Sequence, residues 1–353
     1  LYMNKLVSVL LIAVMVLSLG LTGCGKKDKE KPVLKIFNAG EYIDKSLLIE
    51  FEKAYNCRII YETFDSNESM YTKIRTGETY DILVPSDYMI ERLIKEDYLM
   101  KIDWDQISNK ENLNPDVMGQ KFDPDNEYSV PYFYGTVGIL YNKKVVDKAD
   151  LADGWNLLRN KKYKGDIYMY DSERDSFMVA LKALGYSMNT SNKTKIQKAY
   201  RWLVKQRDTM DVVYVTDDVI DNMISGNKSI AVVYSGDGAL IMSENEDMDF
   251  FEPEEGTNMW TDHMVITKSC KNTELAHEFI NFMCDVDNAY LNSQEVGYSS
   301  AVQSAFEMMR DNDFKGIDAF IPRTGYDKDQ FFRYQKNTLR KYYSELWTKV
   351  KAY

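Results

Sequence analysis

The stretch Tyr80-Asp81-Ile82-Leu83-Val84-Pro85-Ser86-Asp87-Tyr88 decides the fold class, because it predicts a short buried strand that passes directly into a helix. Two similar pairs precede it along the chain. Val33–Asn38 and Arg58–Thr63 have strand character, and helices are predicted to begin at Ser46 and Ser66. Alternating strands and helices predict an α/β fold with a mainly parallel sheet flanked by helices.

The same pattern restarts after residue 134. Strands are predicted at Gly135–Asn142, Gly165–Tyr170, Val212–Val215 and Ser229–Tyr234, with helices between them. A second α/β unit predicts a second lobe. The stretch Tyr128–Tyr134 is then a candidate crossover between the lobes.

The last third of the chain, from His263, is predicted to be mainly helical. The expected helices are Glu274–Asp285, Val286–Val296, Ala305–Asp311 and a long one at Asp327–Lys351. We therefore expect one lobe from residues 33–135 and 262–303, and the other from residues 136–261 and 304–353.

Residues 1–23 have the features of a secretory signal peptide: a basic start, a short apolar core and small residues at a cut site. The apolar run is short for a membrane span, which needs about 20 residues. Leu21-Thr22-Gly23-Cys24 resembles the bacterial lipobox, which implies lipidation at Cys24 and a polar tether over residues 24–32. The alternative is an uncleaved anchor helix with an incidental cysteine.

Composition narrows the classes of ligand. The net charge of −11 argues against a nucleic-acid partner and favours a cationic one. The chain has only two histidines and no Cys-x-x-Cys, so we expect no metal and no cofactor. Cys57, Cys270 and Cys284 are an odd set, so a disulfide framework is not expected, and Cys284 is expected in the core.

Acidic and aromatic residues recur together where strands end and loops lead into helices, which is where open α/β sheets bind ligands. The residues at these junctions are Glu41, Tyr42, Ser86, Asp87, Tyr88, Asp171, Asp175 and Tyr234, joined by Trp260 and Asp262 just before a strand predicted at His263–Thr267 and by Tyr298 after a helix. Carboxylates can fix the ends of a cation, while aromatic faces attract its charge. Taken singly, these residues have simpler explanations. Asp171-Ser172 can cap a helix, and Asp87 is an acid in the first turn of a helix, where the helix dipole favours it.

Several stretches resemble the spermidine/putrescine-binding proteins of bacterial polyamine ABC importers, in the order found in that family. They are residues 38–42, 66–71, 80–88, 122–132, 184–187 and 260–262. The resemblance implies a two-lobed, periplasmic-binding-protein-like fold with the ligand in the cleft between the lobes. It also implies a monomer with no catalysis, anchored outside the cytoplasm, that passes a polyamine to the permease subunits of an importer.

The resemblance also implies roles for single residues. Glu41 would pair with an ammonium beside Tyr42, and Asp262 would hold a secondary amine. Ser86 and Tyr88 would supply hydroxyls, Asp171 and Asp175 acid groups, Tyr234, Trp260 and Tyr298 aromatic walls, and Gln330 a glutamine contact. Ala39 departs from the family, because relatives commonly carry tryptophan there, and this leaves the shape of one end of the cleft open.

Three other functions remain compatible with the residues alone. Glu41, Asp171 and Asp262 could serve a glycoside hydrolase, which needs paired carboxylates. The tyrosines could serve a ferric-ion receptor. A surface adhesin would leave the carboxylates as ordinary solvated groups.

Overall fold

The computed structural model describes residues 31–40, 42–216 and 218–352, and the helices and strands that it describes lie in the compact unit Val33–Tyr353. The signal peptide, the lipidation site Cys24 and the ligand contact Glu41, all predicted from the sequence, fall outside the described residues. No helix within those ranges is long and apolar enough to cross a membrane.

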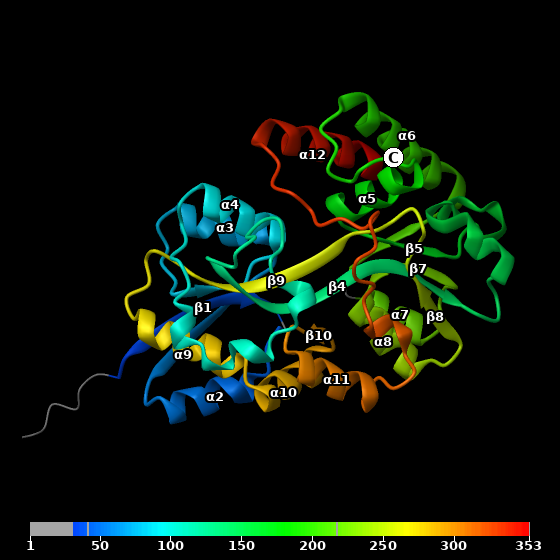
Figure 1. The fold of residues 1–353 in the computed structure, drawn as a ribbon. Coiled ribbons are helices and arrows are strands. Elements are labelled where there is room, and N and C mark those ends of the chain that lie inside the picture. The colour runs from blue at the N-terminus through cyan, green and yellow to red at the C-terminus, as the bar shows by residue number, and fades with distance from the viewer. Residues whose placement is uncertain (1–30, 41, 217, 353) are drawn as a thin grey trace, which may run out of the picture. The chain divides into compact units, whose positions relative to one another are not determined.

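Within the described residues, ten strands form one mixed sheet in the order β2-β1-β3-β9-β4-β7-β5-β6, with β8 and β10 each paired to β4 (Figure 1). The strands are β1 (Val33–Ala39), β2 (Arg58–Phe64), β3 (Ile82–Leu83), β4 (Ser129–Asn142), β5 (Ile167–Tyr170), β6 (Val213–Val215), β7 (Ile230–Tyr234), β8 (Met248–Phe251), β9 (Met259–Ile266) and β10 (Ser299–Ser300). β1 runs parallel to β2 and β3, and β5 runs parallel to β6 and β7. The predicted parallel strands are therefore confirmed at both ends of the sheet.

The centre of the sheet consists of the antiparallel strands β4 and β9. β4 pairs with β9 through its first half, Ser129–Thr136, and with β7 and β8 through Val137–Asn142. The predicted crossover at Tyr128–Tyr134 is thus mostly the first half of a continuous strand. We call the elements around β2, β1 and β3 the first lobe and those around β7, β5 and β6 the second lobe. The residue boundaries expected for the lobes stay a prediction.

β9 begins earlier than the sequence predicts. Trp260-Thr261-Asp262 was expected to precede a strand at His263–Thr267, but all three residues lie within β9. Asp262 pairs with Phe133 and Trp260 with Gly135 of β4, and no turn residue interrupts the strand. Since alternate residues of a strand share a face, Trp260 and Asp262 point to the same side of the sheet.

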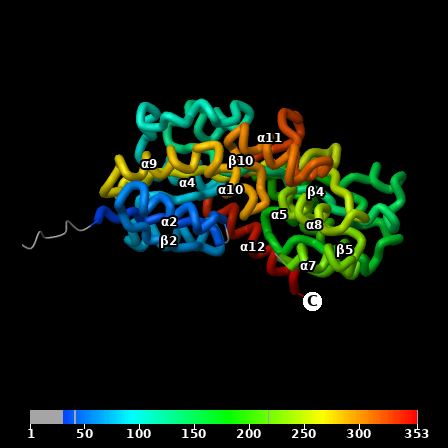
Figure 2. Tube along the Cα trace, turned by 90° about the horizontal axis from the view of Figure 1, so that it is seen from below, coloured from blue at the N-terminus to red at the C-terminus, as the bar shows by residue number. Residues whose placement is uncertain are grey.

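Helices cover both faces of the sheet. They are α2 (Lys45–Ala54), α3 (Asn67–Arg75), α4 (Asp87–Lys95), α5 (Glu173–Ala183), α6 (Lys193–Met210), α7 (Val219–Ile224), α8 (Ser235–Glu244), α9 (Thr273–Met283), α10 (Val286–Val296), α11 (Gln303–Asp311) and α12 (Asn337–Lys351). In the first lobe, α3 and α4 lie over one face, and α2 and α9 lie over the other (Figures 1 and 2).

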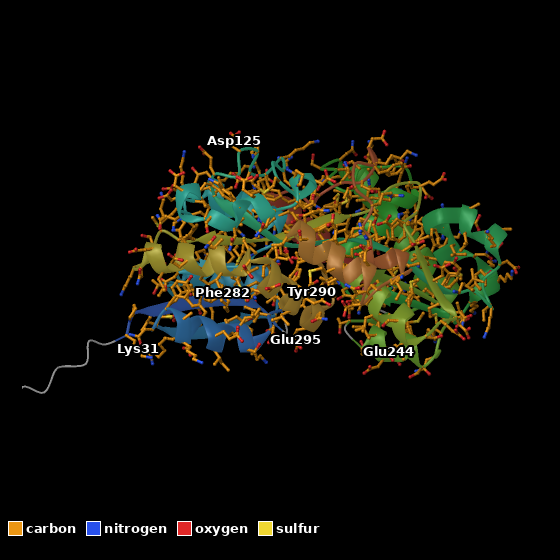
Figure 3. All side chains as sticks on the ribbon, turned by 60° about the horizontal axis from the view of Figure 1, so that its bottom comes forward. Lys31, Asp125, Glu244, Phe282, Tyr290 and Glu295 are labelled. Carbon is orange, nitrogen blue, oxygen red and sulfur yellow. The ribbon has the colours of Figure 1, made fainter. Side chains whose placement is uncertain are left out.

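Aromatic pairs join the helices within each lobe. Phe51 of α2 packs its ring against Phe279 and Phe282 of α9, with centroids 5.1 and 5.4 Å apart (Phe282 is labelled in Figure 3). In the second lobe, Phe177 of α5 meets Tyr343 of α12 at 4.9 Å. Each lobe therefore has its own helix packing, as separate α/β units require.

Two of the predicted helix caps lie at the N-termini of α3 and α5. Ser66 and Ser69 form a reciprocal capping box at α3, and the Ser172 side chain accepts a hydrogen bond from the backbone N–H of Asp175 at α5. Gly77 and Gly185 follow these helices in the left-handed region, at φ 107° and 70°, where a side chain would be strained. These caps and stops fix where the two helices begin and end.

The long C-terminal helix predicted at Asp327–Lys351 is wrong in its first ten residues. α12 begins only at Asn337. The backbone of Gln330 instead bonds to both sides of residue 258: its N–H donates to the carbonyl of Thr257 at 3.0 Å, and its carbonyl accepts from Met259 at 2.9 Å. These long-range bonds hold the segment extended, which helical periodicity could not reveal.

We predict that Gly138→Ala destabilises the protein by about 1–3 kcal/mol. An added Cβ on this central residue of β4 would lie 2.8 Å from the carbonyl oxygen of Phe251 and closer still to the Phe250 ring. Chemical denaturation measures the change. The control is Gly40→Ala, whose Cβ would meet nothing within 4 Å. Equal stability of the two variants would contradict this account of the packing around β4.

Candidate functional site

The carboxyl ends of strands from both lobes surround one cavity of about 760 Å³. Ala39 at the end of β1 and Ser86 after β3 line it from the first lobe, and Tyr170 and Tyr234 at the ends of β5 and β7 line it from the second. The N-termini of α3, α4 and α5 also reach it. This is the place where open α/β sheets bind ligands.

Most of the residues predicted for the site line this cavity. They are Tyr42, Ser86, Asp87, Tyr88, Asp171, Asp175, Tyr234, Trp260, Asp262 and Tyr298. Gln330 does not line it, and Glu41 lies outside the described residues. The structure thus brings ten of the sequence-derived positions together, while their role toward a ligand stays a prediction.

Asp262 of β9 is held by a tyrosine of the first lobe. The Tyr42 hydroxyl donates to its Oδ2 at 2.6 Å. Its Oδ1 is buried and has no hydrogen-bond partner among the described residues. Burial raises the pKa of Asp262, and the nearby hydroxyls of Ser86 and Tyr42 only partly offset this. The carboxylate is therefore held in one orientation, but hydrogen bonds replace only part of the hydration that it loses on burial.

Asp175, in the first turn of α5, has the same arrangement in the second lobe. The Tyr234 hydroxyl donates to its Oδ2 at 2.9 Å, and its Oδ1 is buried with no partner in the described part of the chain. Its pKa is raised, chiefly by burial. Asp175 and Asp262 thus form a pair of tyrosine-held acids, one from each lobe.

Asp87, at the first position of α4, is the most buried of the cavity acids at 1% exposure. Its Oδ1 accepts a hydrogen bond from the Tyr88 backbone at 2.5 Å, and its Oδ2 has no partner within the described residues. Burial raises its pKa well above the ordinary value, and the nearby charge of Asp262 adds to the effect. Three acids of one cavity therefore each carry a buried oxygen without a donor.

Aromatic rings stand edge to face beside these acids. Trp260 and Tyr298 are 5.2 Å apart at 89°, Tyr234 and Trp260 are 6.0 Å apart, and Tyr42 and Tyr298 are 6.0 Å apart. The indole Nε1 of Trp260 is buried without an acceptor in the described structure. Aromatic faces next to carboxylates favour a cation with apolar parts over an anion.

Two predicted contacts are engaged elsewhere. Asp171 Oδ2 accepts a hydrogen bond from the Lys351 ammonium of α12 at 2.7 Å, so a cation of the protein neutralises it. The side-chain oxygen of Gln330 accepts hydrogen bonds from the Ser187 hydroxyl and the Met188 backbone, both at 3.1 Å. Neither group has a buried oxygen without a donor in the described residues, as Asp87, Asp175 and Asp262 do.

Some cavity residues escaped the sequence reasoning. They are chiefly Asn67, Glu68, Arg174, Asn258, Phe332, Gln335, Arg340, Tyr343 and Ser344. Asn67 and Glu68 lie within residues 66–71, one of the stretches that carry the resemblance, and Arg174 lies between Asp171 and Asp175. The position of all three in the sequence is therefore a usable signal. The residues after 331 gave no signal, because their approach depends on folding over more than 140 residues of intervening chain.

Comparison with known proteins identifies the group to which this geometry belongs. A family profile described as bacterial extracellular solute-binding protein matches residues 47–316. The chain is 32% identical over 301 residues to the spermidine/putrescine-binding periplasmic protein of Escherichia coli, covering 85% of each chain.

Two solved structures are similar over nearly their whole length. A spermidine/putrescine ABC transporter substrate-binding protein from Streptococcus pneumoniae is 37% identical, with a TM-score of 0.78 over 91% of this chain and 99% of that one. A lipoprotein of Treponema pallidum is 26% identical, with a TM-score of 0.75 over 90% and 99%. The two-lobed, periplasmic-binding-protein-like fold predicted from the sequence is confirmed.

We predict that Asp87→Asn stabilises the protein at neutral pH by roughly 1–3 kcal/mol, the cost of a buried group left without partners. A carboxyl group with a raised pKa contributes stability below its ordinary pKa, and that stability is lost as the pH rises through the raised value. Asparagine does not ionise, so it avoids this loss of stability, and its side-chain oxygen can still accept the hydrogen bond from the Tyr88 backbone N–H. Thermal unfolding at pH 7 and at about pH 3 measures the difference, which should disappear at the lower pH.

The matched control is Asp171→Asn, because Asp171 is half-exposed and paired with Lys351. Its effect on stability at pH 7 should stay within about 1 kcal/mol. A melting temperature of Asp87→Asn below that of the parent at pH 7 would show that the Asp87 charge is compensated after all.

Proposed function

The chain belongs to the family of bacterial extracellular solute-binding proteins, and on that premise we propose that its solute is a polyamine. One observation carries the proposal. Asp87, Asp175 and Asp262 meet in a single cavity, each with a buried oxygen that lacks a donor among the described residues, beside edge-to-face aromatic rings. Ammonium groups provide the missing donors and charge, and the rings cover the methylene chain between them.

The placement of the acids suits a ligand with separated charges. Asp262 is fixed by Tyr42 of the first lobe, and Asp175 is fixed by Tyr234 of the second. A linear polyamine with one ammonium group on Asp262 and another on Asp175 would bridge the two lobes. The cavity volume of about 760 Å³ lies within the range of small-molecule sites, roughly 300–1,000 Å³.

The names of the relatives agree with this chemistry. The proteins from Escherichia coli and Streptococcus pneumoniae are both named for spermidine and putrescine, and the second is a substrate-binding protein of an ABC transporter. By extension, this chain delivers its ligand to the permease subunits of an importer and carries out no reaction itself. Its acids would then hold a cation and would not act on a bond.

We also propose that the protein is a lipoprotein on the outer face of the cell membrane. The support is the Leu21-Thr22-Gly23-Cys24 motif after an apolar run, together with the similarity to a Treponema pallidum lipoprotein. Lipidation at Cys24 would keep the binding protein close to its permease. The polar residues 24–32 would serve as the tether, and the protein would act as a monomer.

We predict that polyamines bind with micromolar affinity or better, about −8 kcal/mol, and that Asp262→Asn weakens binding by about 2–5 kcal/mol. Asparagine can still accept the Tyr42 hydroxyl bond, so the loss reports the missing charge on the ligand amine. Titration calorimetry of parent and variant with putrescine, spermidine and spermine makes the measurement.

Asp249→Asn is the matched control. Asp249 of β8 also accepts a tyrosine hydroxyl, from Tyr141 at 3.0 Å, but it does not line the cavity. Its substitution should leave the affinity unchanged. The proposal fails if the parent binds none of the three polyamines at millimolar concentration, and the role of Asp262 fails if its variant binds as tightly as the parent.

A further inference from the structure

A cation of the protein reaches from the second lobe to the first across the cavity. Arg174 lies in the first turn of α5, between the acids Asp171 and Asp175. Its guanidinium carbon stands 3.7 Å from the centroid of the Tyr88 ring, which belongs to α4. Its Nη2 also pairs with Oε1 of Glu68, on α3, at 3.5 Å.

The surroundings of the guanidinium have the composition of an ammonium site. The Tyr88 ring lies against the guanidinium carbon of Arg174, and the centroid of the Phe332 ring is 5.5 Å from the same carbon. Glu68 supplies a carboxylate and also accepts the Tyr88 hydroxyl at 3.2 Å. Asp87 lies close enough for its charge to interact with Arg174. Two aromatic rings and two acids therefore surround one positive group.

This arrangement changes the expected role of Tyr88. The resemblance implies that Tyr88 contacts the ligand. In the described structure, however, the Arg174 guanidinium lies against the Tyr88 ring, and the Tyr88 hydroxyl donates to the carboxylate of Glu68. A ligand ammonium can use this ring face only if the guanidinium moves away. The competition is between two cations for one position, and the arginine has the advantage of being attached.

We propose that Arg174 is a built-in cation that occupies the ammonium position on Tyr88 and so limits how many ammonium groups a polyamine can place in the cavity. The inference rests on the proposed function and adds a specificity-determining residue to it. A diamine needs only the acids that Arg174 leaves unpaired. A tetraamine must leave one ammonium outside this position or displace the guanidinium, so its extra charges add little affinity.

The experiment compares putrescine, which has two amines, with spermine, which has four, by titration calorimetry on parent and Arg174→Gln. Glutamine removes the charge and leaves Tyr88 and Glu68 available. We expect the ratio of spermine affinity to putrescine affinity to rise by roughly 2- to 30-fold, the range of one cation–aromatic contact. Arg174→Lys keeps a cation and should hold the ratio near that of the parent.

The double variant Arg174→Gln with Glu68→Gln separates this role from a purely structural one. It should lose most of the gain for spermine, because the freed position then lacks its carboxylate. If Arg174→Gln fails to fold, Arg174→Met carries the same comparison, since it keeps the apolar packing against Tyr88 and Phe332.

An equal change for both ligands would overturn the inference and leave the proposed function intact, because Arg174 would then act only as a contact between the lobes. A shift toward putrescine would overturn it as well. Failure of the parent to bind either ligand would instead overturn the proposed function, and this inference with it.

Discussion

Folding removes water from the carboxyl groups of Asp87, Asp175 and Asp262, and the described residues supply only some of the hydrogen bonds that this water made. Each keeps one hydrogen-bonded oxygen, yet each also has a buried oxygen without a donor, and burial raises the pKa of all three. Folded proteins seldom tolerate such groups, because an unpaired buried charge is costly. Here the cost falls at the cavity where strands of both lobes end, so under the proposed function cation binding would stabilise the folded protein.

The backbone holds these acids and their aromatic neighbours in place. Trp260 and Asp262 share a face of β9 because they are two residues apart, and pairing with β4 fixes their register. Glycines make room for the rings. A Cβ on Gly135 would lie 2.8 Å from the indole Cε2 of Trp260, and one on Gly236 would overlap the Tyr298 ring. Small residues in rigid elements thus allow the site to be preorganised before any ligand arrives.

Local patterns were sufficient for much of this architecture and for ten of the positions that line the cavity. The strands at both ends of the sheet, the caps Ser66 and Ser172 and the strand-end acids all follow from periodicity and capping rules. Long-range pairing was not accessible in this way. The strand through Trp260–Asp262 depends on β4, and the extended segment at Gln330 depends on hydrogen bonds to residues 257 and 259. No local rule encodes a partner more than 70 residues away.

Pairing of charges within the folded chain then separates acids that look equivalent in the sequence. Asp171 and Asp175 are four residues apart, yet Asp171 meets Lys351 of α12, whereas Asp175 keeps an oxygen without a donor. Glu68 similarly meets Arg174, whereas Asp262 forms no ion pair within the described residues and is held by the hydroxyl of Tyr42. The chain therefore pairs some cavity acids with its own cations and, within the described residues, leaves others without one. The net charge favours a cationic ligand, and under the proposed function the distribution of internal cations would decide where its ammonium groups can lie.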